Sequence, residues 1–396
     1  MKDTLLEYLT KKKFIIILYT LLAIGAGIQS LSLGKKSYTE NGKEYNRYNN
    51  YTIFKKSFDH LKTNQDLYIL YPEEHWDLYK YTPTFSVLFG FFSYLPDFIG
   101  LTLWDLLNSL ILIVAIYNIP NLSVKDKGLI LIIISIELMT SLQNAQSNGL
   151  ITGLLILSFG LLENKKYFIA SLCIVLSIYI KLFGIVGFVL FLFYPKKWKL
   201  IIYSFLWSII LFVIPLIFVS FNQCLILLQS YLNLLMNDHT LSYGYSVMGW
   251  LNSWFSLKID KNIIVLIGVI IFLIPLIKFR KYNFYIFRYL TLASILIWVV
   301  IFNHKAESPT FIIAMAGIAL WYIKSRKNML NIILFVTAIL LTSLSPTDIF
   351  PKSLRNEIVV PYTLKVVPCI LIWLKILYDM IVLKESKVET VNINPN

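Results

Sequence analysis

Long apolar stretches recur along this chain, from Lys13 to Lys384, and short charged clusters separate them. Inside a bilayer only helices and closed barrels satisfy their backbone hydrogen bonds, and about 20 apolar residues suffice for one helical crossing. Barrel strands show weak alternation, whereas these stretches are continuous runs of Ile, Leu and Phe. Because only 15% of the residues are charged, little polar surface is left for a water-soluble fold. The sequence therefore predicts an all-α, polytopic transmembrane helical bundle, formed by a single integral membrane domain over residues 1–396.

The apolar stretches predict roughly 11–13 membrane segments, several of them short for a full crossing. They cover residues 14–33, 83–96, 101–118, 128–142, 149–162, 167–181, 183–195, 200–221, 262–278, 284–302, 309–323, 329–345 and 361–384. If every segment before Lys165 crossed the membrane fully, Lys165 would lie outside, whereas its basic cluster predicts a position inside. This conflict indicates that a short segment is re-entrant or broken. Backbone of that kind is tolerated at membrane depth only where it lines a cavity within the protein. We therefore expect a cavity among these segments.

Lysine and arginine outnumber the acidic residues, and the formal net charge is +14. They gather at segment ends, in residues 11–13, 165–166, 196–199, 278–281 and 324–327. This is the positive-inside distribution, which marks those loops as cytoplasmic, so the charge gives no support for nucleic-acid binding. By alternation the two long polar segments, 34–82 and 222–261, are external loops. The last residues, 385–396, are predicted to be a disordered cytoplasmic tail.

The first external loop concentrates carboxylates and aromatic residues. Asp66, Glu73, Glu74 and Asp77 lie among tyrosines that end with Tyr81. Sugars stack on aromatic faces and hydrogen-bond to carboxylates, so this mixture suits a carbohydrate. An interfacial loop with an aromatic belt would have the same composition.

Three polar features interrupt the membrane segments. Gln143, Gln146 and Asn148 lie between two apolar runs, where amides need partners. They line a ligand cavity or join neighbouring helices through hydrogen bonds. Lys181 breaks an apolar stretch, where a charge is costly and is a functional candidate by default. It binds an anionic headgroup or extends its charge to the membrane surface.

His304 and Lys305 lie between two predicted segments and could donate hydrogen bonds to a phosphate. Such donors stabilise the charge that builds on a leaving group, although lone histidines also serve structural roles. Motifs for nucleotide, dinucleotide and zinc binding and the hydrolase nucleophile elbow are missing from the sequence. We therefore expect neither a cofactor nor a metal.

Several short motifs follow one another in a characteristic order. They are Tyr51, Ile53-Phe54, Asp66-Leu67-Tyr68, Tyr81-Thr82-Pro83, Gln146-Ser147-Asn148, Ile180-Lys181, and His304 with Ser308-Pro309. This order resembles the GT-C-type glycosyltransferases of family 87 (the DUF2029 group), polyprenyl-phosphate-sugar-dependent membrane enzymes that include α-1,2-mannosyltransferases. The resemblance spans about residues 14 to 325.

The resemblance implies an integral membrane glycosyltransferase of the plasma (inner) membrane of a bacterium, with its site facing outward. The donor substrate would be a hexose or pentose on a polyprenyl phosphate, and the acceptor a cell-envelope glycan or glycolipid. A carboxylate of the first loop would act as general base. Lys181, His304 and Lys305 would stabilise the departing phosphate.

The sequence departs from the family pattern at one position, because the catalytic Asp of the family aligns with Asn50. A neutral amide is no general base, so Asp66, Glu73, Glu74 or Asp77 is expected to take over. Asp77 and Glu74 are favoured because they lie close to the Tyr81 motif. The alternatives are a different alignment, a catalytically inactive scaffold for envelope assembly, and a transporter or flippase for lipids or glycans. A transporter would show internal repeats and mid-membrane charges in both halves, which the sequence gives no sign of beyond Lys181.

Overall fold

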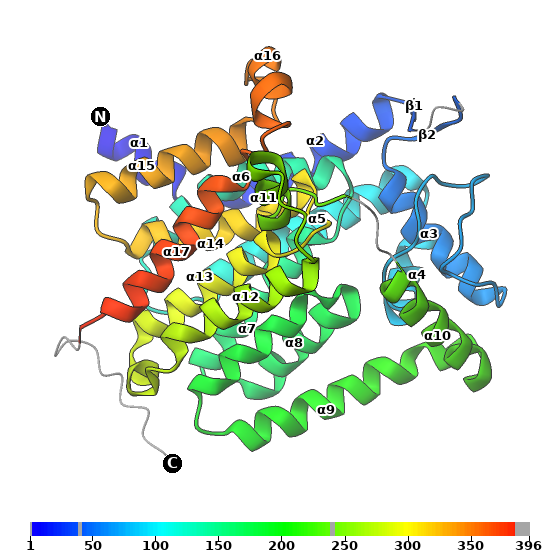
Figure 1. The fold of residues 1–396 in the computed structure, drawn as a ribbon. Coiled ribbons are helices and arrows are strands. Elements are labelled where there is room, and N and C mark those ends of the chain that lie inside the picture. Colours follow the sequence, from blue (N-terminus) through cyan, green and yellow to red (C-terminus); the bar gives the residue numbers. More distant parts are fainter. Residues whose placement is uncertain (1, 39–41, 238–241, 385–396) are drawn as a thin grey trace. The chain divides into compact units, whose positions relative to one another are not determined.

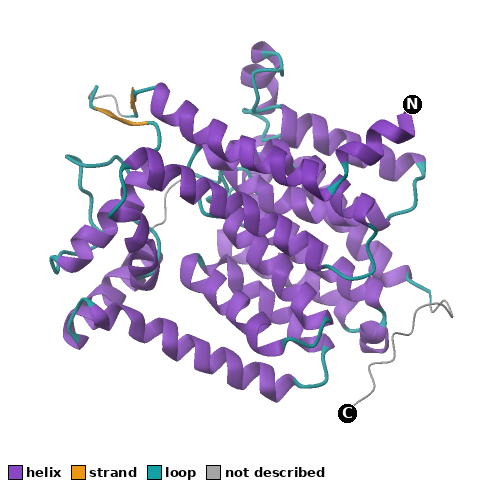
Figure 2. Ribbon diagram, turned by 180° about the vertical axis from the view of Figure 1, so that it is seen from behind, coloured by secondary structure: helices purple, strands orange, loops and turns teal. Residues whose placement is uncertain are grey.

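The computed structural model describes residues 2–38, 42–237 and 242–384, and nearly all of their regular structure is helical (Figures 1 and 2). The short strands β1 (Lys35–Ser37) and β2 (Glu44–Asn46) form an antiparallel pair in which Lys36 faces Tyr45. The predicted all-α helical bundle is confirmed. The predicted tail, 385–396, lies outside the described residues. The chain divides into two compact units.

The first unit comprises Met1–Val124, Leu138–Ile185 and Trp198–Thr240. Its helices are α1 (Lys2–Leu9), α2 (Lys12–Ser32), α3 (Asn49–Lys62), α4 (Pro83–Ser93), α5 (Asp97–Asn118), α7 (Asn148–Glu163), α8 (Tyr167–Ile180), α9 (Lys197–Val213) with η2 (Ile214–Ile217), and α10 (Phe221–Asn237).

The second unit comprises Lys125–Glu137, Val186–Lys197 and Leu241–Asn396. Its helices are α11 (Val247–Phe255), α12 (Lys261–Leu276), η3 (Phe279–Asn283), α13 (Tyr285–Ile301), η4 (Ser308–Thr310), α14 (Phe311–Lys324), α15 (Met329–Thr337), η5 (Ala338–Leu344), α16 (Lys352–Leu354), η6 (Arg355–Val359) and α17 (Val367–Val382). Helices α6 (Val124–Gln143) and η1 (Leu182–Phe193) are divided between the two units.

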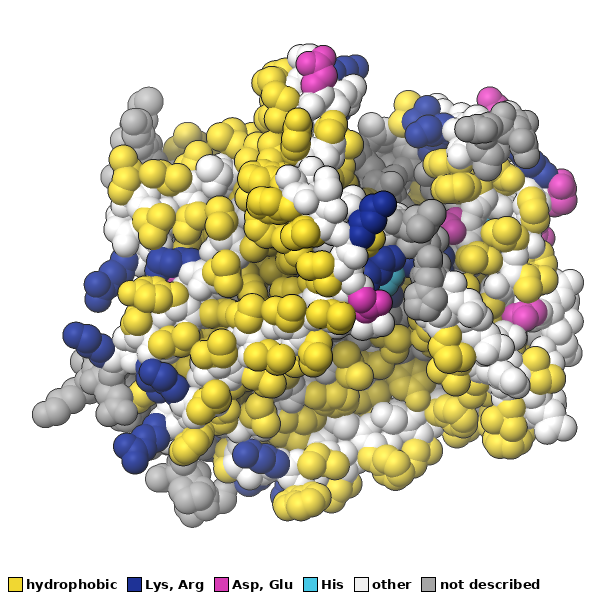
Figure 3. Space-filling view, in the orientation of Figure 1, with side chains coloured by type: hydrophobic (Ala, Val, Ile, Leu, Met, Phe, Trp, Pro, Cys, Tyr) yellow, Lys and Arg dark blue, Asp and Glu magenta, His cyan; other side chains and the backbone are white. Residues whose placement is uncertain are grey.

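Apolar side chains cover much of the helical surface (Figure 3). Among the described residues, three helical stretches are long and apolar enough to cross a membrane by themselves: Lys12–Ser32, Asp97–Asn118 and Lys197–Ile217. Further apolar helices of 10–17 residues, among them Pro83–Ser93 and Asn148–Glu163, are too short to cross by this criterion. On α9, Ile202 and Phe205 leave 60% and 68% of their surface uncovered by protein. In a bilayer these apolar side chains contact lipid chains in place of water, so these features fit an integral membrane protein.

Helices α5 and α7 approach each other closely through glycines. A Cβ atom at Gly153 would lie 2.7 Å from a side-chain carbon of Ile111, and one at Gly160 would lie 2.7 Å from the carbonyl oxygen of Asn118. In lipid there is little hydrophobic drive between helices, so packing through small residues supplies much of the attraction. These glycines therefore hold α7 against α5, directly after the polar residues that precede α7.

Helix α3 was not predicted, because residues 34–82 read as a polar loop. One face of α3 is nevertheless apolar at helical spacing, with Tyr51, Phe54, Phe58 and Leu61 all buried. Phe54 makes edge-to-face contacts with the rings of Phe85 and Phe89 of α4 at 5.2 and 5.3 Å, and with that of Trp104 of α5 at 5.9 Å. This aromatic packing fixes α3 on α4 and thereby positions Asn50.

Candidate active site

The first turn of α3 is tied to the polar turn between α6 and α7. The side-chain amide of Asn50 donates a hydrogen bond to the carbonyl oxygen of Asn144 at 2.9 Å, and the indole of Trp104 donates to that of Ala145 at 3.0 Å. Ala145 has a left-handed backbone, with φ of 48°, which these bonds help to hold. A carboxylate at position 50 has no proton to donate to Asn144, so the amide is the group that makes this link.

The predicted amides separate into two groups. Gln143 donates to the side-chain oxygen of Gln29 of α2 at 2.6 Å, which is the helix-joining role weighed for it. Gln146 and Asn148 are buried, and the amide of Asn148 donates to the side-chain oxygen of Gln146. Between them, Ser147 donates to the hydroxyl of Tyr81 at 3.2 Å. The turn therefore connects Asn50 on one side with Tyr81 on the other.

Lys181 lies over the same tyrosine. Its ammonium nitrogen is 5.4 Å from the ring centre of Tyr81 and 5.1 Å from that of Phe183. Helix α8 ends at Ile180, and Lys181 itself has an extended backbone with φ of −147° and ψ of 138°. The break that the sequence indicated at Lys181 is thus present, and it turns the cation toward an aromatic face, where cation–π attraction holds it.

An apolar pocket of about 370 Å³ borders this cluster within the first unit. Its walls include Thr82, Tyr179 and Leu182 on one side and Cys224, Leu228 and Tyr231 of α10 on the other. The hydroxyl of Thr82 donates to the carbonyl oxygen of Tyr179, which closes α4 onto the end of α8. Lys181 directly precedes Leu182 of the pocket wall, and its ammonium lies over the ring of Tyr81, which directly precedes Thr82 of that wall. The backbone on either side of this cation–π contact therefore borders the apolar pocket.

The loop carboxylates differ in their neighbours. The backbone N–H of Trp76 donates to the side-chain oxygen of Asn49 at 3.2 Å, so the chain directly before Asp77 lies at the first turn of α3, beside Asn50. Asp77 accepts from the backbone N–H of Leu78 at 2.7 Å and from Lys80 at 3.1 Å. Of the loop carboxylates, Asp77 therefore directly follows the residue that is hydrogen-bonded to the first turn of α3.

The other carboxylates have partners elsewhere. Glu74 lies 2.9 Å from the Nε2 atom of His60, which is roughly 15 Å along α3 from Asn50 at 1.5 Å per residue. Burial lowers the pKa of His60, and Glu74 partly opposes this shift. Asp66 accepts from Ser230 of α10 at 2.9 Å, and Glu73 pairs with Lys43 at 2.6 Å.

In the second unit, the turn that carries His304 and Lys305 is tightly fixed. The side-chain oxygen of Asn303 accepts from the backbone N–H of Lys305 at 3.0 Å, and Tyr245 donates its backbone N–H to the carbonyl oxygen of Ala306 at 2.9 Å. Gly244 packs so closely here that a Cβ atom would lie 2.8 Å from the carbonyl oxygen of His304, and its φ is +53°. Only glycine adopts this backbone without strain at such an approach.

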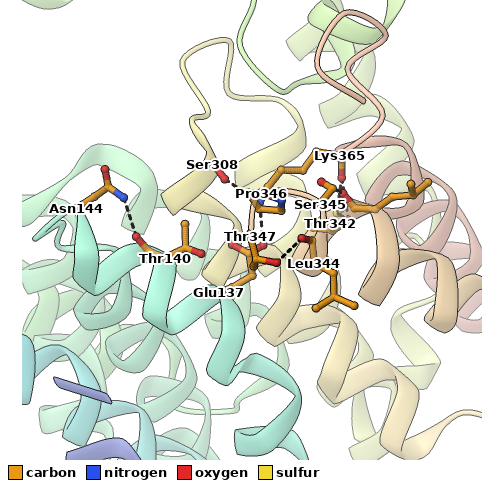
Figure 4. A network of polar contacts seen from close by, with 12 residues as sticks. Glu137, Thr140, Asn144, Ser308, Thr342, Leu344, Ser345, Pro346, Thr347 and Lys365 are labelled. Atoms are coloured by element: carbon orange, nitrogen blue, oxygen red, sulfur yellow. Dashed lines mark hydrogen bonds and ion pairs between the residues drawn. The ribbon is translucent and has the colours of Figure 1, made fainter. Parts of the chain in front are cut away.

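A buried ion pair supports the same region of the second unit (Figure 4). The ammonium of Lys365 donates to Glu137 at 2.8 Å and to the hydroxyl of Ser308 at 3.0 Å. The side chains of Lys365 and Glu137 are 2% and 0% exposed. The same cation lies 4.8 Å from the ring centre of Phe311. The pair thereby anchors the Ser308-Pro309 step that leads from the His304 turn into α14.

Sequence reasoning missed Glu137 and Lys365. A signal was present, because Glu137 stands alone within an apolar run, as Lys181 does. Asp105 of α5 is a second such residue; it is 1% exposed, and neither carboxylate oxygen has a hydrogen-bond partner within the described parts of the chain. Lys181 is therefore one of several ionisable residues that interrupt the apolar stretches.

Comparison with known proteins gives one family. The model of glycosyltransferase family 87 matches residues 79–346. The match includes Tyr81, Gln146, Asn148, Lys181 and His304 and begins after the loop carboxylates. No curated protein matches the chain.

Proposed function

Because the chain belongs to glycosyltransferase family 87, we propose that it transfers a hexose or pentose from a polyprenyl-phosphate donor to a cell-envelope glycan or glycolipid. It is an integral membrane glycosyltransferase, and it therefore has a sugar donor and an acceptor as substrates. The proposal adds the donor class, a mannosyltransferase-like hexose preference, and a site at the outer face of a bacterial plasma membrane.

The observation that carries the donor assignment is the position of Lys181 beside the apolar pocket. A polyprenyl-phosphate sugar combines an anionic phosphate with a long apolar chain. The pocket of about 370 Å³ offers apolar walls. The ammonium of Lys181 lies 5.4 Å from the ring centre of Tyr81, the residue that directly precedes Thr82 of the pocket wall. An ammonium binds phosphate as a compact point charge. This pairing supports a lipid phosphate over a water-soluble nucleotide sugar.

The transfer step needs a base and a stabilised leaving group. We assign the base to Asp77, whose carboxylate takes the proton of the acceptor hydroxyl. The hydroxyl oxygen then forms a bond to the anomeric carbon while the bond from that carbon to the phosphate oxygen breaks. The polyprenyl phosphate leaves with the electron pair, and Lys181 stabilises its negative charge. His304 and Lys305 keep their predicted role as phosphate donors on the sequence argument alone.

A second candidate function rests on Asn50. The family pattern has an Asp where this chain has Asn50, whose amide donates to Asn144. If that Asp is required for catalysis, this chain binds the donor without transferring its sugar. Such a chain would serve as a scaffold in envelope assembly. Both candidates share the donor site, and they differ only in whether sugar is transferred.

Donor binding tests the site that both candidates share. Replacing Lys181 by Met is expected to weaken binding of a polyprenyl-phosphate sugar about tenfold or more, since hydrogen bonds to charged groups contribute roughly 1.5–3 kcal/mol. Lys181→Arg keeps the charge and is expected to retain most of the affinity. Titration of the labelled donor against protein in lipid nanodiscs measures both effects.

Lys166→Met is the matched control for this measurement. Lys166 is an exposed lysine directly before α8, at the opposite end of that helix from Lys181. Its loss is expected to leave donor binding unchanged. Equal affinities for wild type and Lys181→Met, or an equal loss in the Lys166 variant, would contradict the assignment of the phosphate to Lys181.

A further inference from the structure

A second and larger cavity, of about 700 Å³, lies within the second unit. It is formed where α14 and α17 end and where α13 and α15 begin, and it is lined by residues of all four helices. Lys and Arg side chains gather on the left of Figure 3, where Figure 1 places the C-terminal end of α17. The sequence predicted the basic cluster 324–327, part of which lines this cavity, to be cytoplasmic.

The wall of this cavity is strongly basic. Four basic side chains and one carboxylate line it: Lys324, Arg326, Lys375, Lys384 and Asp379. Asp379 interacts with Lys375 and accepts from the indole of Trp321 at 3.2 Å. The negative charge of Asp379 is thereby paired with Lys375. Lys324, Arg326 and Lys384 add further basic groups to the wall, and a basic wall favours an anion.

The loop that carries Arg326 is held in place. Asn331 donates its side-chain amide to the carbonyl oxygen of Arg326 at 2.9 Å, and its backbone N–H donates to the side-chain oxygen of Asn328 at 2.9 Å. Asn328 thereby caps the start of α15. These bonds fix the backbone at Arg326 over the cavity, while its guanidinium, whose planar donor fork matches a phosphate, stays exposed.

The same cavity is apolar below its basic rim. Leu290 and Trp321 line it from the protein interior. Leu330, Tyr378 and Val382 also line it and leave 54%, 58% and 46% of their surface exposed. A small water-soluble anion makes no favourable contact with these apolar side chains. A ligand with a phosphate headgroup and acyl chains contacts both surfaces, because its phosphate pairs with the basic side chains and its acyl chains pack on the apolar ones.

We propose that this cavity binds the headgroup of an anionic glycerophospholipid, with the phosphate at Lys324 and Arg326 and the acyl chains along α15 and α17. Basic pockets between membrane helices are suited to such headgroups. The site belongs to the second unit, whereas Tyr81, Lys181 and their apolar pocket belong to the first. The bound lipid is a structural ligand and takes no part in the transfer step.

Native mass spectrometry of the delipidated full-length protein tests this site. Phosphatidylglycerol is expected to bind with saturable stoichiometry, and zwitterionic phosphatidylcholine far more weakly. The double variant Lys324→Gln, Arg326→Gln is expected to lower the affinity for phosphatidylglycerol about thirtyfold, given the contribution of each basic residue near an anionic lipid. Arg326 is exposed, so the single variant Arg326→Gln is expected to fold normally and to show an intermediate loss.

The matched control removes the same charge elsewhere. Lys197 and Lys199 are exposed lysines of another basic cluster and do not line this cavity, and their replacement by Gln is expected to change the affinity less than threefold. An equal loss in the control pair would show general surface attraction and overturn the proposal. Competition by inorganic phosphate at the lipid's own concentration would identify a free-anion site, and stronger binding of polyprenyl phosphate would identify a donor-lipid site. Either outcome overturns the phospholipid assignment.

Discussion

Replacing Asp77 by Asn is expected to lower the rate of sugar transfer by about two to four orders of magnitude, the usual contribution of a general base. The amide keeps the oxygen that accepts from the backbone of Leu78 at 2.7 Å, so the local backbone stays in place. It loses the ability to take the acceptor proton, together with the ion pair to Lys80. Donor binding at Lys181 is expected to be unchanged. Steady-state transfer by the reconstituted protein measures the loss as a fall in kcat with an unchanged KM for the donor.

Two controls separate proton transfer from structure. Lys80→Met removes the ion pair of Asp77, whose atoms lie 3.1 Å apart, but leaves the carboxylate. Glu73→Gln neutralises an exposed carboxylate of the same loop, whose side chain is 89% exposed. Both variants are expected to keep at least about half of the activity, since exposed ion pairs contribute little. If Lys80→Met lost as much activity as Asp77→Asn, the effect would be one of loop structure and Asp77 would not be the base.

The largest effect on stability is expected from Lys365→Met, which should lower the free energy of unfolding by about 3–5 kcal/mol. The variant leaves Glu137, 0% exposed, without the cation that lies 2.8 Å away. It also removes the hydrogen bond to Ser308 at 3.0 Å. The Ser308-Pro309 segment before α14 thereby loses one of its contacts. Thermal unfolding of the purified protein in lipid nanodiscs measures the loss.

The double variant Lys365→Met, Glu137→Leu tests the reason for this loss. Replacing both partners of a buried ion pair by apolar residues of similar volume is often neutral. The double variant is therefore expected to recover most of the stability that the single variant loses. A double variant less stable than Lys365→Met would contradict an uncompensated charge as the cause.

Much of the helical order follows from the sequence, because membrane helices appear as long apolar runs. The break at Lys181 was visible for the same reason, since a charge interrupts such a run. Helix α3 was missed because its polar face dominates the composition of Asn49–Lys62. Its apolar face repeats at helical spacing, and a search for that period within the loop would have found it.

The candidate site was only partly predictable, because its links join distant parts of the chain. The bond between Asn50 and Asn144 spans 94 residues, and that between Lys365 and Glu137 spans 228. No local pattern reveals such partners. The choice among the loop carboxylates likewise depends on the contact of Trp76 with Asn49, which only the fold establishes.

Sugar transfer by the purified chain in nanodiscs tests directly whether the protein is a lipid-phosphate-dependent glycosyltransferase. Radiolabelled polyprenyl-phosphate hexoses and pentoses are supplied with cell-envelope glycans and glycolipids, and label in the acceptor is counted. Transfer from one of these donors is expected, with release of polyprenyl phosphate. Tight donor binding without transfer from any of them would contradict the enzymatic role and support the scaffold, and transfer from nucleotide sugars alone would contradict the donor class.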